Sequence, residues 1–409
     1  LDRRQKNAVY ASIDKSLIVL SPPGCGKTLL MAKRIEYLIK TGAVAPPFKI
    51  LGLTFTNAAA NEMKDRVANE VPKAESIVYI TNFHSFAYSI LRAYGNIVGI
   101  SKKFTVLGEI EKEDFSLSVL GRYEKTIKDI LESPPEDRWR QLQNNNVWRK
   151  YKAWNIEKLL KDNEEYEDEE YDELFAKVLR EYRNGLGRKS FLDFDHILWY
   201  TYKLLSDNIS LIDYYRASFK YVLVDEFQDT NSLQFRILSL LASDNNLKSS
   251  PRYLPAKVFI LADPDQAIYE FQGATPENIE VAKNVFQCEI IELDEDYRSS
   301  CDGIKLLRSA ISSFMRNGHL INGLVNHTSD KPSFVALSNM RKEAQYILEK
   351  VKEHESDNIQ LHDIAIVAFD QYRLDKVKNL LDQEDIDYIF VPGFRANNVQ
   401  REYRRLFKS

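Results

Sequence analysis

The stretch SPPGCGKT, residues 21–28, decides the fold of this 409-residue chain. It stands between an apolar run at 16–20, suited to a buried strand, and residues 28–40, whose apolar side chains recur at helical spacing. A strand, a glycine turn and a helix in this order form the context of a phosphate-binding loop. The two prolines carry no N–H group, but they lie on the approach from the strand. Gly24 through Thr28 keep the N–H groups that a phosphate requires.

The side chains of this loop fit a nucleotide with its metal ion. Gly24 and Gly26 permit close approach of the backbone to a phosphate. Lys27 is expected to reach the β- and γ-phosphates, and the Thr28 hydroxyl to ligate Mg²⁺. The same letters also occur in ordinary strand-to-helix turns, so this interpretation needs a second motif.

The second motif is VLVDEFQDT, residues 222–230, in which an apolar strand ends on adjacent acids. Asp225 is expected to hold Mg²⁺, and Glu226 to orient or deprotonate the attacking water. Acids at a strand end also occur as simple caps or turns. Together with the phosphate-binding loop, they favour a nucleoside triphosphatase.

The rest of the chain predicts an α/β fold. Strand-like runs followed by helical patterns recur at 49–55 and 221–227, and a further strand is expected at 257–263. This alternation predicts a doubly wound parallel sheet with its ligands at the carboxyl ends of the strands. A second α/β stretch follows Arg298. Its strands are expected at 334–337, 363–369 and 388–392.

Composition is that of an ordinary soluble protein, with 44% hydrophobic and 28% charged residues and a net charge of −4. No apolar run approaches the roughly 18 residues of a membrane span, so no membrane contact is expected. Three scattered cysteines argue against a disulfide framework or a zinc site and favour the cytoplasm. The acidic run at 161–173 is expected to be solvated surface or a mobile connection.

Several further stretches accompany the two motifs. They are Gln5 in LDRRQKNAV, TFTNAAANEMKDRV (54–67), NFHSFAYSILR (82–92), LADPDQAIYEFQGA (261–274) and LDEDYRSS (293–300). In this order around the phosphate-binding loop, they closely resemble the motifs of superfamily 1 DNA helicases of the UvrD/Rep/PcrA type. The resemblance covers roughly residues 1–300 and implies two RecA-like P-loop domains.

The resemblance also implies a domain plan. A first RecA-like ATPase domain would comprise 1–93 and 191–278. A helical insertion that contacts nucleic acid would occupy 94–190, and a second RecA-like domain, incomplete at its C-terminus, 279–409. The family's later motifs are absent after residue 300, so the chain resembles part of a helicase and is expected to hydrolyse ATP poorly.

The resemblance further implies ATP and Mg²⁺ as cofactors and assigns nucleotide contacts. Gln5 would read adenine and Tyr297 would stack on it. Gln266 would sense the γ-phosphate, and Arg298 would contact it from the second domain. The full expected cofactor-binding set is Gln5, Pro23, Gly24, Cys25, Gly26, Lys27, Thr28, Leu29, Tyr297 and Arg298.

Contacts with single-stranded DNA are implied in the same way. Phe55, Tyr269 and Phe271 would stack on bases, which suits movement independent of sequence. Thr56 and Asn57 belong to the segment that grips the strand. His84 would contact the DNA backbone or couple it to ATP. By pattern alone, the aromatic residues are expected in the core and His84 as a buried histidine.

Five positions depart from the family pattern, namely Ser21, Leu29, Ala58, Gln272 and Asp296. Ala58 and Gln272 stand where relatives carry Lys and Arg. With two cations fewer near the expected path of the DNA strand, DNA affinity is expected to be weaker and less dependent on salt. Asp296 stands where relatives carry Asn.

The tryptophan-rich stretch RWRQLQNNNVWRKYKAW, residues 138–154, interleaves cations with flat rings. It suits either a nucleic-acid groove or an amphipathic helix with buried tryptophans, and the second is favoured. Asp193 and Asp195 in LDFDHILWY are expected to be helix caps and structural contacts.

Two functions are compatible with these patterns. The first is an ATP-dependent helicase or translocase that moves 3′ to 5′ on single-stranded DNA and unwinds 3′-tailed duplex, in DNA repair, recombination or phage defence. The second is a nucleotide-sensing, DNA-binding regulatory subunit of a nuclease or other effector, with weak unwinding or none. A nuclease or a repair or defence factor would be the protein partner in either case.

Overall fold

The computed structural model describes residues 1–71, 74–108, 111–112, 115, 118–119, 170–244, 252–267, 277–298, 323–324, 333–368 and 371–390. For residues 75, 170–179 and 323–324 it describes the backbone alone. The chain forms two compact units, unit 1 (Leu1–Lys331) and unit 2 (Pro332–Ser409).

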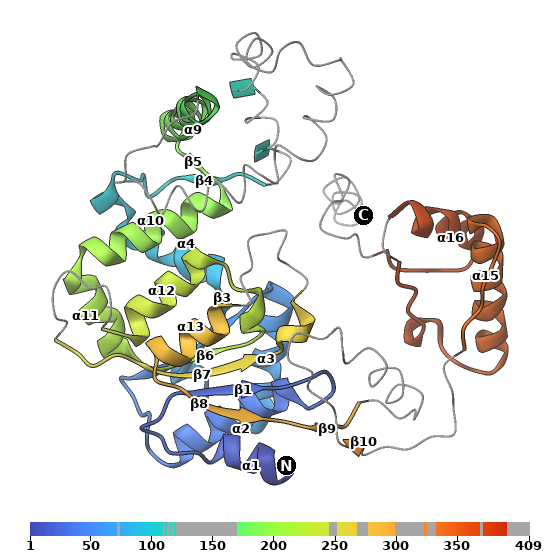
Figure 1. Cartoon of the computed structure of the whole chain (residues 1–409), viewed down its shortest axis with the longest axis horizontal. Helices are drawn as coiled ribbons and strands as arrows, with labels where there is room; N and C mark the ends of the chain where they lie inside the picture. Colours follow the sequence, from blue (N-terminus) through green and yellow to red (C-terminus); the bar gives the residue numbers. More distant parts are fainter. Residues whose placement is uncertain are drawn as a thin grey trace. The chain divides into compact units, whose positions relative to one another are not determined.

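Six parallel strands form the centre of unit 1 (Figure 1). They are β1 (Leu17–Leu20), β2 (Lys49–Thr54), β3 (Val78–Asn82), β6 (Phe219–Val224), β7 (Lys257–Ala262) and β8 (Glu289–Glu292). Their order across the sheet is β3-β2-β6-β7-β1-β8, and every neighbouring pair is parallel. The predicted parallel sheet is confirmed. Because the strands run the same way, the motifs that follow them meet at one edge.

Helices cover both faces of this sheet, so its strands are buried on both sides. In β1, Ile18 and Leu20 join one apolar cluster, whereas Leu17 and Val19 join the other. One face carries α1 (Arg3–Val9), α2 (Lys27–Lys40) and α3 (Asn57–Glu70). The other carries α4 (Phe83–Tyr94), α10 (Phe194–Asp207), α11 (Ile209–Ser218), α12 (Ser232–Ala242) and α13 (Asn278–Val285).

A buried arginine fixes the helix that follows the phosphate-binding loop. The Arg34 guanidinium in α2 donates hydrogen bonds to the carbonyls of Val9 (2.8 Å), Ala11 (2.7 Å) and Ser12 (3.2 Å). These carbonyls belong to the last residue of α1 and to the connection between α1 and β1. Since buried polar groups must be paired, the arginine ties α2 firmly to this connection and gives the loop a rigid base.

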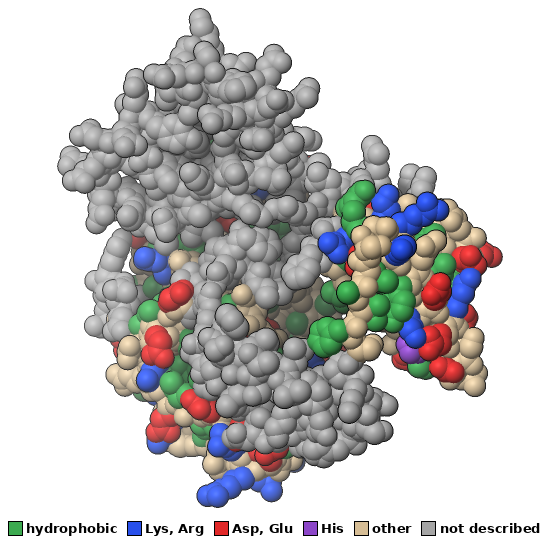
Figure 2. Space-filling view, turned by 45° about the vertical axis from the view of Figure 1, so that its right-hand side comes forward, with side chains coloured by type: hydrophobic (Ala, Val, Ile, Leu, Met, Phe, Trp, Pro, Cys, Tyr) green, Lys and Arg blue, Asp and Glu red, His purple; other side chains and the backbone are tan. Residues whose placement is uncertain are grey.

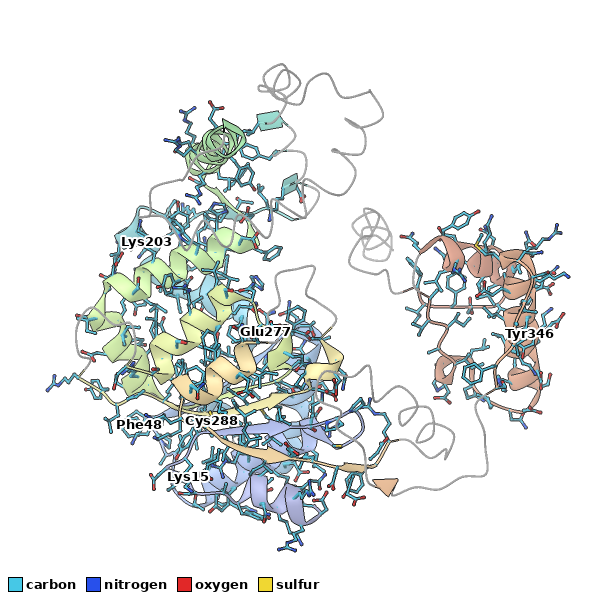
Figure 3. All side chains as sticks on the ribbon, viewed as in Figure 1. Lys15, Phe48, Lys203, Glu277, Cys288 and Tyr346 are labelled. Atoms are coloured by element: carbon cyan, nitrogen blue, oxygen red, sulfur yellow. The ribbon has the colours of Figure 1, made fainter. Side chains whose placement is uncertain are left out.

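An ion pair links the amino-terminal ends of the neighbouring strands β1 and β8. Lys15, which precedes β1 and is labelled in Figure 3, binds the carboxylate of Glu289 at the start of β8. The Glu289 N–H also donates to the Ser16 carbonyl at 3.0 Å. These contacts hold β8 beside β1, so the segment that follows β8 emerges next to the phosphate-binding loop.

Within the predicted insertion, the structure describes a small part with its own core. β4 (Thr105–Val106) pairs in parallel with β5 (Phe191–Leu192), and α9 (Glu170–Lys189) leads into β5. The core side chains are Leu107, Val119, Tyr182 and Leu186. The tryptophan-rich stretch 138–154 lies outside the described residues. The domain boundaries predicted from the sequence stay predictions.

The described part of unit 2 contains two helices that pack together. α15 (Met340–Ser356) and α16 (Gln371–Gln383) share a core of Ala344, Leu348, Val351, Val377 and Leu381, and η9 (Leu361–Asp363) lies between them in the chain. Both helices fit the second α/β stretch that was expected after Arg298.

The three strands expected in unit 2 are not formed by the described parts of 334–337, 363–369 and 388–392. A strand needs a ladder partner, and an apolar run in the sequence does not supply one. Phe334, Val367 and Ile389 are consequently 85%, 90% and 92% exposed. Apolar side chains are visible on the surface of this unit in Figure 2.

Candidate functional site

The phosphate-binding loop has the backbone that its glycines predict. Gly24 and Gly26 adopt φ angles of 84° and 81°, which other residues rarely adopt. Gly26 is the N-cap of α2, and among the described residues no side chain caps the first turn of this helix. The first N–H groups of α2 and the positive end of its dipole therefore remain directed at the sheet edge, an arrangement that attracts anions.

The loop lysine and the acid pair meet at this edge. Lys27 Nζ lies 2.9 Å from Glu226 Oε2, although the two residues are 199 positions apart in the chain. The Lys27 side chain is 13% exposed and that of Glu226 is 34% exposed. Both residues were expected at the phosphates from the sequence, and the structure brings them together.

Asp225 lies deeper than Glu226, at the end of β6. Burial, together with the charge of Glu226, raises the pKa of Asp225 to about 6. Burial disfavours the ionised form of this carboxylate, because charge is costly in a low dielectric. A bound cation would stabilise the ionised form. Mg²⁺ prefers oxygen ligands, so Asp225 and the Thr28 hydroxyl fit the expected metal ion.

Glu226 has a strained backbone, with a φ angle of 48°. For a residue other than glycine, this conformation costs on the order of 1 kcal/mol and is typical of functional sites. It turns the chain sharply after β6 and directs the Glu226 carboxylate towards Lys27.

Two residues that were given no role from the sequence, Gln228 and Asp263, connect the acid pair to Gln266. Gln228 donates to Glu226 Oε2 at 2.7 Å and accepts the N–H of Asp263 at 2.9 Å. The Asp263 carboxylate in turn accepts from Gln266 Nε2 at 2.5 Å. The expected γ-phosphate sensor Gln266 is therefore linked to Glu226 through two intermediates. Nothing in the sequence distinguishes Gln228 except its place two residues after the acid pair.

The residues expected at adenine converge on the loop from another side. Gln5 Nε2 donates to the Cys25 carbonyl at 3.0 Å, and its Oε1 accepts the Asp2 N–H at 3.0 Å. The Tyr297 hydroxyl donates to Asp2 Oδ2 at 2.7 Å. Burial and this hydrogen bond raise the pKa of Tyr297. Asp2, which the sequence analysis did not assign, thus joins Gln5 to Tyr297.

Arg298 follows directly and lies beside the loop. The Tyr297 N–H donates to the Gly24 carbonyl at 2.9 Å, and the Arg298 N–H to Asp296 Oδ1 at 2.8 Å. The Arg298 side chain is exposed. The sheet edge therefore brings together the segments that carry Gln5, the loop, the acid pair, Gln266 and Arg298.

Comparison with known proteins agrees with this constellation. Residues 1–287 match the UvrD/REP helicase N-terminal domain, and residues 291–396 match the UvrD-like helicase C-terminal domain. The chain belongs to the UvrD/Rep helicase family. The two matched domains fit two RecA-like domains, as the sequence analysis expected.

Named UvrD/Rep relatives extend this result. An ATP-dependent DNA helicase PcrA of Staphylococcus epidermidis is 27% identical over 398 residues, which are 96% of this chain and 51% of that protein. A probable DNA helicase II homolog of Mycoplasma capricolum is 29% identical over 366 residues, 89% of this chain and 48% of that protein. The chain spans about half the length of the curated relatives it matches. In the described ranges, every helix is too short or too polar to cross a bilayer.

The segments expected to hold DNA in this UvrD/Rep chain follow β2 and β3. Thr56 caps α3 by accepting the Ala59 N–H at 3.1 Å, and Phe55 before it is half-buried. Asn57 Oδ1 accepts from Asn82 Nδ2 at 2.6 Å, which ties the two segments together. Tyr269 and Phe271, together with Gln272, lie outside the described residues, so the place of these side chains stays a prediction.

His84, in the first turn of α4, packs against Phe194 of α10. Their rings meet edge to face, with the centroids 5.3 Å apart. Burial lowers the pKa of His84, and the opposing effect of Asp195 is smaller. A neutral imidazole on an aromatic ring is compatible with both expectations for this residue, a buried histidine and a contact to DNA.

Asp193 is the centre of a buried polar cluster that includes Tyr182, His196 and Lys112. As expected, it caps α10, accepting the His196 N–H at 2.8 Å. It also binds His196 Nδ1 at 2.7 Å and accepts from the Tyr182 hydroxyl at 2.8 Å. Lys112 Nζ lies 3.7 Å from Asp193 and 2.7 Å from Asp195. Burial alone would raise the pKa of Asp193, but His196 and Lys112 lower it well below its usual range.

Asp193→Asn is therefore expected to lower the free energy of unfolding by about 3 kcal/mol at neutral pH, because a buried ion pair loses one partner. A depressed folded-state pKa contributes stability that is complete above the unfolded pKa of about 4, begins to fall as pH drops below it and is lost as pH falls through the folded-state pKa. Urea unfolding at pH 7 and pH 3.5 should show that loss in the parent protein and a smaller one in Asp193→Asn. Asp195→Asn, at a position 16% exposed, should cost less. Equal costs for the two variants would contradict the central role of Asp193.

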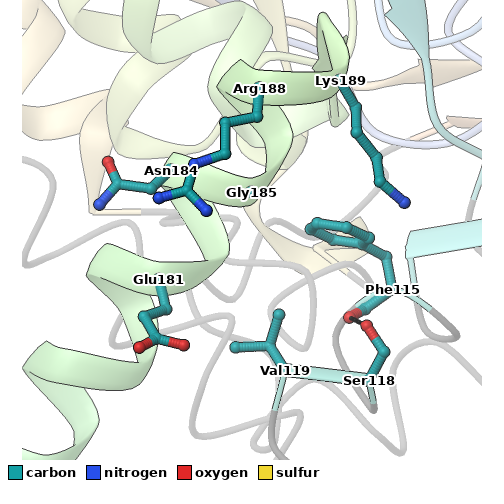
Figure 4. A pocket seen from close by; sticks show the side chains of 8 residues that line it. All are labelled: Phe115, Ser118, Val119, Glu181, Asn184, Gly185, Arg188 and Lys189. Atoms are coloured by element: carbon teal, nitrogen blue, oxygen red, sulfur yellow. Dashed lines mark hydrogen bonds between the residues drawn. The ribbon is translucent and has the colours of Figure 1, made fainter.

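One hollow in the described part of the chain is lined by residues of α9 together with Phe115, Ser118 and Val119 (Figure 4). Its volume is about 340 Å³, and Arg188 and Lys189 of α9 contribute to its lining. Lys189 Nζ sits 5.4 Å from the centre of the Phe115 ring. None of the residues that line the hollow belongs to the candidate nucleotide site.

Proposed function

We propose that this chain is the ATP-hydrolysing part of a DNA helicase that moves 3′ to 5′ along single-stranded DNA and separates 3′-tailed duplex. The observation that carries the proposal is the contact between Lys27 and Glu226, 2.9 Å long, beside the uncapped first turn of α2. A phosphate-binding lysine and a carboxylate able to activate water are the two groups that phosphoryl transfer from ATP requires.

In the proposed mechanism, Lys27 leaves Glu226 when the triphosphate arrives and binds the β- and γ-phosphates. Glu226 is then released to orient or deprotonate the attacking water. Asp225 and Thr28 would hold Mg²⁺, which neutralises phosphate charge when bound. Arg298, exposed beside Gly24, would approach the γ-phosphate as the two RecA-like domains close.

Coupling to DNA is proposed to use the hydrogen bonds between the strand ends. The path from Glu226 through Gln228 and Asp263 reaches Gln266, which directly precedes the segment with Tyr269 and Phe271. A change at the γ-phosphate would shift this segment. Aromatic platforms that stack on any base would then advance along the strand, because every base has a π-face.

A regulatory subunit is the second candidate function, and one observation favours it. Ala58 is exposed at the start of α3, beside Asn57, where a cation would meet the DNA backbone. A weaker grip on DNA suits a protein that senses nucleotide and signals to a nuclease or to a repair or defence factor. In either role we propose repair, recombination or phage defence as the setting.

Strand separation distinguishes the two candidates. With ATP and Mg²⁺, the purified protein is expected to separate a 3′-tailed duplex and to leave a 5′-tailed duplex intact. A labelled strand released from each substrate measures this, and a non-hydrolysable ATP analogue provides the control. ATP turnover without release from either substrate, together with stimulation of a co-purifying nuclease, would favour the regulatory subunit.

A further inference from the structure

A buried carboxylate covers Gly24 of the phosphate-binding loop. Asp296, in the short strand β9 (Glu295–Asp296), is 0% exposed. A Cβ atom built on Gly24 would lie 1.9 Å from Asp296 Oδ1, so the carboxylate occupies the space that a side chain would need. The carboxylate group of Asp296 thus lies directly against the loop.

The same carboxylate organises the segment at 296–298. Asp296 Oδ1 accepts the Arg298 N–H at 2.8 Å, and the intervening Tyr297 N–H donates to the Gly24 carbonyl at 2.9 Å. The bond from Tyr297 fastens the segment to the loop, and the bond to Asp296 fixes the turn within the segment itself. Tyr297 and Arg298, which are proposed to contact the nucleotide, are therefore held beside Gly24 by the Tyr297 N–H, in a turn that the Asp296 carboxylate stabilises.

The negative charge of Asp296 makes its contact with Gly24 sensitive to bound phosphates. The loop and the first turn of α2 attract anions, and a bound triphosphate brings several negative charges to the place where Asp296 carries its own. Interactions between charges are strong at buried positions, where water screens them little. Asp296 and a bound nucleotide therefore repel each other, and the repulsion grows with the number of phosphates.

We propose that Asp296 is a positioning residue that opposes nucleotide binding by its charge, so that arrival of the phosphates releases the segment at 296–298 from Gly24. The proposal rests on the proposed nucleotide site and adds a device that regulates it. Nucleotide affinity is thereby lowered, and the segment that carries Arg298 becomes free to move only when the loop is filled.

Binding of ATP, ADP and AMP to the Asp296→Asn variant tests this. Asparagine keeps the shape of the side chain and an oxygen that accepts the Arg298 N–H. The variant is expected to bind ATP about tenfold more tightly than the parent, to bind ADP with a smaller gain and AMP with almost none. Its KM for ATP should fall more than its kcat changes. The matched control is Glu295→Gln, which removes a charge from the opposite face of the same strand and should leave affinity unchanged.

Equal affinities of parent and variant for all three nucleotides would overturn the proposal, and so would an equal gain for AMP and ATP. Should Asp296→Asn fail to fold, Asp296→Ser, small and uncharged, must give the same order of gains. A wrong assignment of the nucleotide site would give a different result. In that case the parent protein binds no nucleotide, or binding survives Lys27→Ala, and both proposals are overturned.

Discussion

Lys27→Ala is expected to abolish DNA-stimulated ATP turnover, with a loss in kcat of at least about a hundredfold. Lys27 is the cation that the structure places at the end of the loop, between the first turn of α2 and Glu226. Without it, charge that develops on the phosphates has no ammonium group to stabilise it. Phosphate release at saturating single-stranded DNA measures the effect.

Lys40→Ala is the matched control for this prediction. Lys40 ends the same helix, its side chain is 70% exposed, and it pairs only with Glu36 of the preceding turn among the described residues. Its removal should leave turnover unchanged, since exposed pairs contribute little. Turnover retained in Lys27→Ala would place the phosphates elsewhere in the molecule.

Four of the six strands in the central sheet of unit 1, β1, β2, β6 and β7, were expected from the sequence because they are apolar runs, whereas β3 and β8 were not expected. SLIVL before the loop and VLV before Asp225 are strands β1 and β6 in the structure. The order of the strands was not predictable, since it depends on pairing between segments far apart, such as β2 with β6. In unit 2, the expected strands were wrong in their described parts because apolar composition does not by itself create a ladder partner.

The site was predictable to the extent that it follows the strand ends. Parallel strands bring their carboxyl ends to one edge, so a lysine after β1 and an acid after β6 had to approach each other. Gln228, Asp263 and Asp2 were missed because their roles come from tertiary distances, and a glutamine or an aspartate in a turn has no distinctive pattern. The cluster around Asp193 was missed for the same reason: Lys112 and Asp195 are 83 positions apart.

Glu226→Gln is expected to lower kcat for ATP by about a hundredfold or more while ATP binding becomes tighter. The glutamine cannot accept a proton from water, so the chemical step is lost. At the same time Lys27 loses its ion pair with Glu226, in which Nζ and Oε2 are 2.9 Å apart, and becomes available to phosphate. Turnover measurements and direct titration with ATP report the two effects separately. They distinguish this variant from Lys27→Ala, in which both quantities should fall.

Glu62→Gln supplies the control, because Glu62 on α3 is an acid near Asp225 that is 64% exposed and pairs with Arg66. Its removal should change neither quantity, since solvent screens an exposed carboxylate. If Glu226→Gln lost affinity and turnover together, Glu226 would act mainly by supporting Lys27. If turnover persisted with tight binding, the group that activates water would have to be a different carboxylate at the same edge, and Asp263, whose carboxylate accepts from Gln266 Nε2, would be the next to replace.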